Sequence, residues 1–184
     1  YNSIFEKVRR IYTPIFAKAG FQLLLESDWN DSSVKAFSVD KKDNPNRRKV
    51  YVSGGYARKT LMTKDALLLT ICHEIGHHLG GYPKIPGITW GSSVEGQADY
   101  FATAKCMKLV LSDEIETNEN VANSSGIPEF VKDDCGRQFN TKEEQNLCLR
   151  ISVASEEQAK TLMNEDLSFS MYLGNFDESH IEQM

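Results

Sequence analysis

The sequence has no long apolar run and no excess of positive charge. Its apolar stretches, such as residues 66–69, are far shorter than the roughly 20 residues with which a helix crosses a bilayer. The 184 residues include 21 lysines and arginines against 26 aspartates and glutamates, which gives a net charge of −5. Such a chain has no cationic surplus with which to neutralise a phosphate backbone. We therefore expect no membrane span in this chain and no nucleic acid as its partner.

Several common catalytic motifs are also missing. The serines have no Gly-x-Ser-x-Gly context, no glycine-rich loop has the pattern that cradles phosphate, and no two cysteines form a CxxC pair. These absences argue against a serine hydrolase of that type, a P-loop and a zinc ribbon. Hydrophobic residues make up 40% and charged residues 26% of the chain, which excludes a disordered or low-complexity chain. We expect a single folded domain over residues 1–184.

The four cysteines, Cys72, Cys106, Cys135 and Cys148, leave two interpretations open. Four buried free thiols would indicate the cytoplasm, whereas a disulfide would indicate an oxidising compartment. We favour at least one disulfide, involving Cys106, Cys135 or Cys148, because these residues flank a long polar segment that a cross-link would tether. A periplasmic or secreted protein is then expected, with a cytoplasmic one as the alternative.

The N-terminal part of the chain predicts one helix and a small sheet. Apolar residues recur at helical spacing over residues 3–19, where Pro14 is expected to kink or divide the helix. Residues 21–29, 33–40 and 49–53 are short segments rich in β-branched and aromatic residues, separated by Asn, Asp, Ser and Pro clusters. We interpret them as three strands of a small antiparallel sheet.

The remainder of the chain predicts helices. Thr63 is a plausible N-cap for a helix that continues to Leu79, and Ser92 with Glu95 fits a capping box for a second helix to about residue 111. Thr141 with Glu144 fits another capping box for a third helix to about residue 164, and the polar residues 112–134 between them are expected to form a loop. The fold class predicted is α+β.

The most informative pattern is a cluster of histidines. Three of the four histidines fall within residues 73–78, and His73-Glu74-Ile75-Gly76-His77 is an HExxH motif inside a predicted helix. Residues four apart are separated by about 400°, so both imidazoles project from one face and can bind a single zinc ion. Glu74 points about 100° away, from where its carboxylate can reach a metal-activated water. His78 is expected to be a surface or supporting histidine and not a ligand.

Two histidines do not complete a catalytic zinc site, which normally has three protein ligands and one water. The candidate for the third ligand is Glu95, eighteen residues after His77 on the next predicted helix. Asp99 follows one turn later on the same face, where it can accept the remaining N–H of a ligating histidine. The two motifs therefore predict one ion per chain.

These motifs resemble a known family. His73-Glu74-Ile75-Gly76-His77 and Glu95-Gly96-Gln97-Ala98-Asp99 resemble the two helices of the gluzincin metallopeptidases, and in particular the minimal catalytic domain of the CAAX prenyl protease and HtpX heat-shock protease family. Ala36-Phe37 and the segment 50–55 look like the strand and hairpin that precede the active-site helix in that family. The resemblance implies a zincin-like fold in a soluble relative, with the small sheet packed on the two motif helices.

The resemblance also implies an activity. It assigns one zinc ion to His73, His77 and Glu95, general base and acid to Glu74, and support of a ligand to Asp99. The expected function is a zinc-dependent endopeptidase acting on a protein or peptide substrate. Relatives carry a later His-Pro element that assists substrate binding; His180 is the candidate contact here, and the element itself is expected beyond Met184.

Two other functions remain open from the residues. The domain could keep zinc only as a structural element of a catalytically inactive binding or regulatory protein, in which case a fourth protein ligand would close the site. It could also be a helical domain without metal. The oligomeric state is not predicted.

Overall fold

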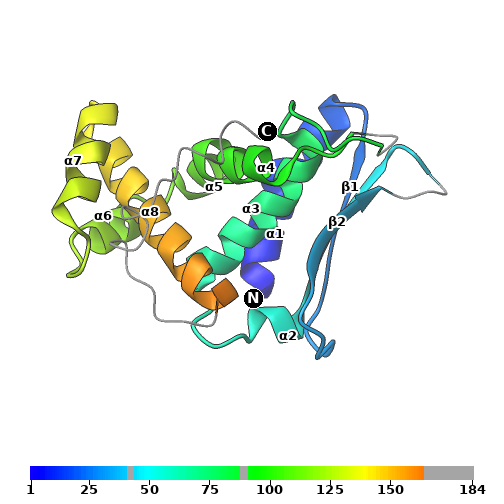
Figure 1. The fold of residues 1–184 in the computed structure, drawn as a ribbon, viewed down its shortest axis with the longest axis horizontal. Helices are drawn as coiled ribbons and strands as arrows, with labels where there is room; N and C mark the ends of the chain where they lie inside the picture. The colour runs from blue at the N-terminus through cyan, green and yellow to red at the C-terminus, as the bar shows by residue number, and fades with distance from the viewer. Residues whose placement is uncertain (41–43, 88–90, 164–184) are drawn as a thin grey trace, which may run out of the picture.

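The computed structural model describes residues 1–40, 44–87 and 91–163. The N-terminal helix α1 (Asn2–Lys18) buries Ile4, Phe5, Val8, Tyr12 and Phe16 along one face, as the spacing predicts. Pro14 lies inside this helix, which continues past it to Lys18, so the proline does not divide it. Figure 1 shows α1 beside the central helix α3 (Lys64–Leu79).

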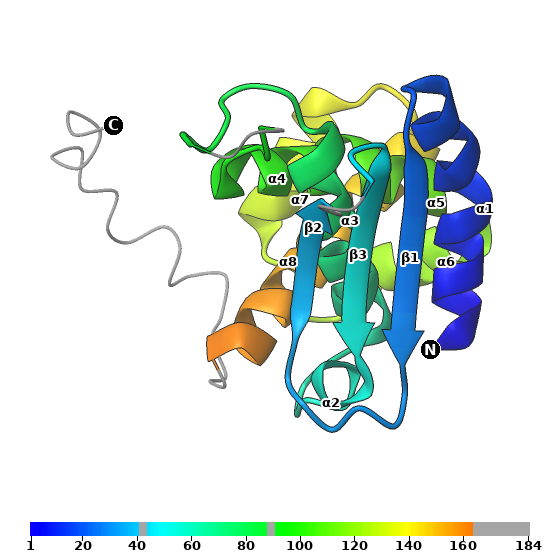
Figure 2. The same ribbon diagram turned by 90° about the vertical axis from the view of Figure 1, so that its right-hand side faces the viewer.

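The sheet has three strands, β1 (Gln22–Asp28), β2 (Ala36–Asp40) and β3 (Arg47–Ser53), in the order β1-β3-β2. The strand β3 is antiparallel to β2 but parallel to β1, so the prediction of an antiparallel sheet is wrong and the sheet is mixed. The reason is that β3 is inserted between two strands of opposite direction. This central position suits Val50 and Val52, which are fully buried. Figure 2 shows the three strands in front of α3.

The helix α3 is the centre of the core. Almost every side chain from Ala66 to Cys72 is buried, since the sheet, α4 (Glu95–Phe101) and α8 (Lys142–Met163) all pack against this helix. Thr63 caps it by accepting a hydrogen bond from the Ala66 N–H at 3.1 Å. A short helix α2 (Gly54–Ala57) connects the sheet to this cap.

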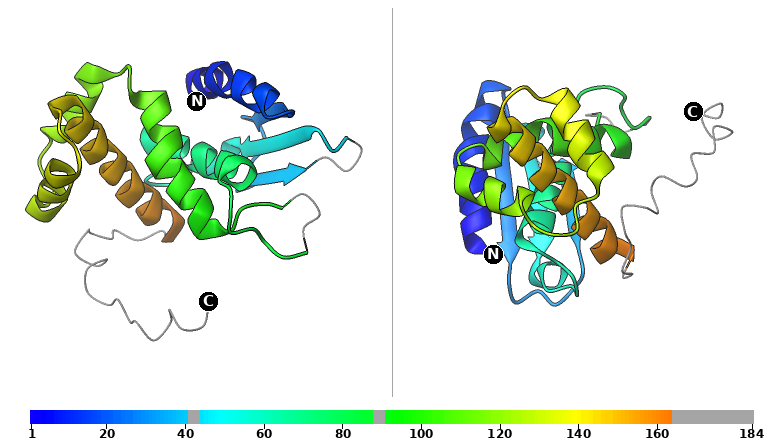
Figure 3. Two further views of the ribbon diagram at one scale, coloured as in Figure 1. Left: turned by 90° about the horizontal axis from the view of Figure 1, so that it is seen from above. Right: turned by 90° about the vertical axis from the view of Figure 1, so that its left-hand side faces the viewer.

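The second predicted helix begins at Glu95 with Val94 as its N-cap, two residues later than the Ser92 capping box predicts. It runs from α4 through a π-helical turn, η1 (Ala102–Cys106), into α5 (Met107–Leu111). Residues 112–134 are not a loop, because α6 (Ile115–Ala122) and most of α7 (Glu129–Gln138) lie there. Figure 3 shows these two helices packed beside α8, on the side of the molecule away from the sheet.

The structure contains two disulfides. Cys72–Cys106 connects α3 to η1, and Cys135–Cys148 connects α7 to α8. The prediction of at least one disulfide is confirmed, although the partner of Cys106 is Cys72 and not a residue beyond the polar segment. None of the helices in the described ranges is long and apolar enough to cross a membrane.

Candidate metal centre

The helix α3 carries both histidines of the motif on one face. The rings of His73 and His77 lie 4.7 Å apart between centroids and are nearly perpendicular. Their side chains are 18% and 9% exposed, so each ring is held by the surrounding protein but still reaches an open cleft. The cap at Thr63 fixes the start of this helix and hence the direction in which both rings project.

A hydrogen bond at Nδ1 fixes the tautomer of each histidine ring. Nδ1 of His73 is 2.7 Å from Oδ1 of Asp99, and Nδ1 of His77 is 2.9 Å from the carbonyl oxygen of Ser93. A carbonyl and an ionised carboxylate can only accept a hydrogen bond, so Nδ1 donates in both cases. Nε2 of each ring therefore keeps its lone pair for a metal ion.

Glu95 approaches both of these nitrogens from α4. Its Oε2 lies 3.1 Å from Nε2 of His73, and its Oε1 lies 3.6 Å from Nε2 of His77. Two ligands that bind zinc tetrahedrally at about 2.0–2.1 Å are about 3.3–3.4 Å apart, and the two distances lie on either side of that value. His73, His77 and Glu95 thus form a group that could hold a metal ion. Two neutral imidazoles and a carboxylate are a donor set that suits zinc.

The segment between the two helices brings them together. Gly81 turns the chain at a φ of 91°, a conformation that L side chains rarely adopt. Lys84 and Ser93 then form an antiparallel bridge, and the Ser93 N–H donates to the carbonyl oxygen of His77 at 2.9 Å. The hydroxyl of Ser93 also donates to the carbonyl oxygen of Gly81 at 2.8 Å. Ser93 therefore anchors α4 to the end of α3 and holds the second histidine at the same time.

Glu74 lies beside the three ligand side chains without belonging to the group. The residue is only 7% exposed, and this burial raises the pKa of its carboxyl group, although the neighbouring His73 and His77 act in the opposite direction. A carboxyl group in this environment is easier to protonate than an ordinary glutamate. It is therefore suited to exchanging a proton with a molecule in the cleft.

The cleft in front of these residues has a volume of about 420 Å³. His73, Glu74, His77 and Glu95 form one side, and the rest of the lining is Ala36, Phe37 and Ser38 from β2 together with Ile85 and Ser92 from the segment before α4. The strand β2 is at the edge of the sheet, so among the described residues one side of its backbone has no partner strand. The metal-ligating group thus faces a groove bordered by an unpaired strand edge.

The remaining two histidines have different positions. The His78 side chain is 2% exposed and lies against the sheet, with Nε2 3.1 Å from the carbonyl oxygen of Lys49 and Nδ1 3.4 Å from Oδ1 of Asp40. Of the two expected positions, surface or supporting, the surface position is wrong, and His78 does not belong to the group that could hold a metal ion. His180 lies outside the described residues.

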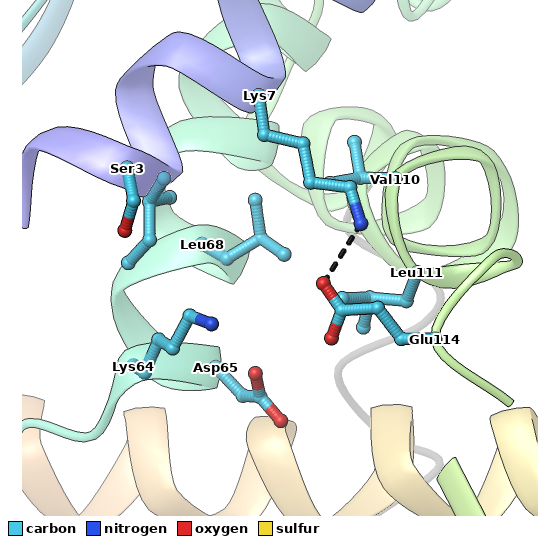
Figure 4. A pocket seen from close by; sticks show the side chains of 9 residues that line it. Ser3, Lys7, Lys64, Asp65, Leu68, Val110, Leu111 and Glu114 are labelled. Carbon is cyan, nitrogen blue, oxygen red and sulfur yellow. Dashed lines mark hydrogen bonds and ion pairs between the residues drawn. The ribbon is translucent and has the colours of Figure 1, made fainter. Parts of the chain in front are cut away.

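A second cavity, of about 240 Å³, lies at the other end of α3 (Figure 4). Lys7 donates to Glu114 at 2.7 Å there, and Arg150 lies 2.7 Å from Asp65 and 2.9 Å from Glu114. The acidic groups of this cavity are thus already neutralised by cations. It has no group arranged like that of His73, His77 and Glu95, which makes the metal-ligating cleft the candidate functional site.

The role of Ser93 in holding His77 could not be predicted from the sequence. The one signal beside it was Ser92, which with Glu95 fits a capping box. Comparison of the chain with models of protein families, with curated proteins and with solved structures gives no match.

Proposed function

We propose that this protein is a zinc-dependent endopeptidase. The single observation that carries the proposal is the convergence of His73, His77 and Glu95 with a buried Glu74 beside them, all facing one cleft. A zinc ion, when bound, would polarise the substrate carbonyl and lower the pKa of a water toward about 7.

Glu74 is the residue to which we assign proton transfer. Its carboxylate takes a proton from the attacking water and returns it to the amine of the leaving peptide. Burial, which raises the pKa of Glu74, helps the first step, because a carboxylate with a raised pKa is a stronger base. His73 and His77 hold their protons on Nδ1 against Asp99 and Ser93, so they bind but do not transfer protons.

The groove supports an extended peptide as the substrate. A peptide laid along β2 would bond to the unpaired edge of that strand and would pass over Glu74 and the ligand group. The bridge between Lys84 and Ser93 borders the groove on its other side, so such a peptide would lie between two backbone segments.

A zinc-stabilised binding or regulatory domain is the alternative that the sequence leaves open. A structural zinc site is closed by four protein ligands. In the described ranges, the group around His73 and His77 has Glu95 as its one further ligand, because Oδ1 of Asp99 is engaged by His73. A fourth position left to water would favour catalysis.

The resemblance of the two motifs to the gluzincin metallopeptidases, including the CAAX prenyl protease and HtpX family, supports the same proposal. The two disulfides favour an oxidising compartment, and we propose a periplasmic or secreted location on that basis.

The test is the substitution Glu74→Gln. It keeps the size of the side chain but removes the base, so we expect one zinc per chain, as in the parent protein, and peptide hydrolysis reduced by a factor on the order of 10² to 10⁴. Glu95→Gln should lose most of the zinc, and Glu129→Gln on the exposed side of α7 should change neither quantity. A parent protein that holds no zinc, or a Glu74→Gln variant that cleaves peptides at the parent rate, would contradict the proposal.

A further inference from the structure

The two helices that carry the metal ligands touch along a line of three contacts. At one end, Nε2 of Gln97 donates to the carbonyl oxygen of Gly80 at 2.6 Å. In the middle, a Cβ on Gly76 would lie 2.7 Å from the carbonyl oxygen of Ala98, so the two backbones meet there without a side chain between them. At the other end, the Cys72–Cys106 disulfide joins α3 to η1, with its Cα atoms 5.5 Å apart and both residues fully buried.

The π-helical turn keeps the buried residues of this second helix on one side. Ala98, Ala102, Cys106 and Val110 are buried and four residues apart. In a regular α-helix each step of four overshoots a full turn by about 40°, so these residues would drift by about 120° in total. A π-helical turn contains an extra residue and absorbs most of this drift. Cys106 therefore faces α3 at the level of Cys72.

The ligand end of the second helix is held by the Ser93 contacts and by packing against α3, not by the ligand side chains themselves. The side chains of Glu95 and Asp99 are 75% and 66% exposed, so they contribute almost no packing. The helix α4 has seven residues and no side-chain cap at its start. A segment of this length is not stable without tertiary contacts. The contacts with α3 thus decide where these two carboxylates lie.

We propose that the Cys72–Cys106 disulfide is a positioning element of the metal centre. It is covalently adjacent to His73 on one side, and on the other side it lies at Cys106, seven residues after Asp99 in the continuous helix that carries Glu95 and Asp99. By preventing α4–η1 from sliding along or away from α3, it keeps the carboxylates of Glu95 and Asp99 within reach of His73. This inference rests on the proposed function, because it concerns the same metal site.

The chain contains its own control. Cys135–Cys148 joins α7 and α8 and packs in a separate small cluster with Ile127, Val131 and Leu149. None of the residues of that cluster is a candidate ligand. Removal of this disulfide should lower the stability of the fold without moving the metal ligands.

The experiment compares the double variants Cys72→Ala/Cys106→Ala and Cys135→Ala/Cys148→Ala with the parent protein. Zinc affinity is measured by competition with a chelator, the ligand geometry by the absorption bands of bound Co²⁺, and folding by circular dichroism. We expect the first variant to bind zinc about 10- to 100-fold more weakly and to shift the Co²⁺ bands, as when a supporting residue of a metal site is removed. The second variant should match the parent in both measurements. Cys72→Val/Cys106→Ala, which refills the buried space, serves as a second variant of the first pair.

Equal zinc affinity in the parent and in a folded variant of the first pair would overturn the proposal, and so would an equal loss in both pairs. If both variants of the first pair fail to fold while the second pair folds, the disulfide serves the whole fold and the proposal also fails. A parent protein that binds no zinc would instead refute the proposed function, so the two failures are distinguishable.

Discussion

Gly76→Ala is the perturbation that tests the contact between the two ligand helices most directly. The new Cβ would lie 2.7 Å from the carbonyl oxygen and 2.8 Å from the Cα of Ala98, whereas ordinary contacts are 3.4–4 Å. These atoms belong to the backbone and cannot rotate away, so α4 has to move by about 0.6–0.7 Å to reach the shortest ordinary contact.

The size of the effect follows from this displacement. Overpacking of this kind costs about 1–3 kcal/mol, and the better helix propensity of alanine returns about 0.5–1 kcal/mol. The difference lies between about 0 and 2.5 kcal/mol, and we expect the free energy of unfolding to fall by about 1 kcal/mol, the middle of this range. Metal–ligand distances tolerate about 0.2 Å, so a Glu95 carboxylate displaced with α4 should weaken zinc binding by at least about 10-fold.

The assay is urea denaturation in the presence of a chelator, together with zinc competition. Gly136→Ala is the matched control, because a Cβ at this position in α7 meets no atom within 4 Å. It should raise stability by up to about 1 kcal/mol and leave the zinc affinity unchanged. If Gly76→Ala keeps the stability and zinc affinity of the parent, the two helices do not meet as closely as described and the reasoning is refuted.

The buried ion cluster behind the second cavity gives two more predictions. Arg150→Met should lower the free energy of unfolding by about 3–5 kcal/mol in thermal or urea denaturation, because Asp65 loses its partner and Glu114 keeps only Lys7; an unchanged midpoint would contradict this. Burial alone would raise the pKa of Glu114, but the hydrogen bonds from Lys7 and Arg150 outweigh it and lower the pKa below the ordinary value of 4.5. The folded state thus binds fewer protons at this group, so its contribution is present above about pH 4.5 and is lost as the pH falls through the lowered pKa. Denaturation as a function of pH should show a smaller acid-induced loss for Glu114→Gln than for the parent.

The helix of the HExxH motif could be predicted because local signals agree. Thr63 caps the helix as expected, and the capping box of Thr141 with Glu144 forms at 3.3 Å between the Glu144 N–H and the Thr141 hydroxyl. The Ser92 capping box does not form. Ser93 next to it bonds to Gly81 and His77, and these contacts across the turn determine where α4 begins. Local patterns therefore predict a helix start only where no tertiary contact competes for the same groups.

The sheet order and the helices of residues 112–134 could not be predicted for the same reason. The position of β3 between β1 and β2 depends on how the strands pack on α3. The alternation of apolar and polar residues within one strand shows which face is buried but does not show the order of the strands. The helix α6 buries only Asn118 and Ala122, and the Asn118 side chain bonds to Leu111 and Arg150. The polar composition of this segment is typical of a loop. Its helix is stabilised by contacts with residues distant along the chain, and a local sequence pattern does not show such contacts.

The helix α3 carries two lines of residues with the same four-residue period. Cys72, Gly76 and Gly80 face α4, while His73 and His77, one position later, face the cleft. Because the two lines are neighbours on one rigid helix, any change in the distance between α3 and α4 also changes the distance from the histidines to the carboxylates of α4. The candidate metal site and the helix interface thus share the same two helices, so the close approach at Gly76 bears directly on how near the Glu95 carboxylate lies to His73 and His77.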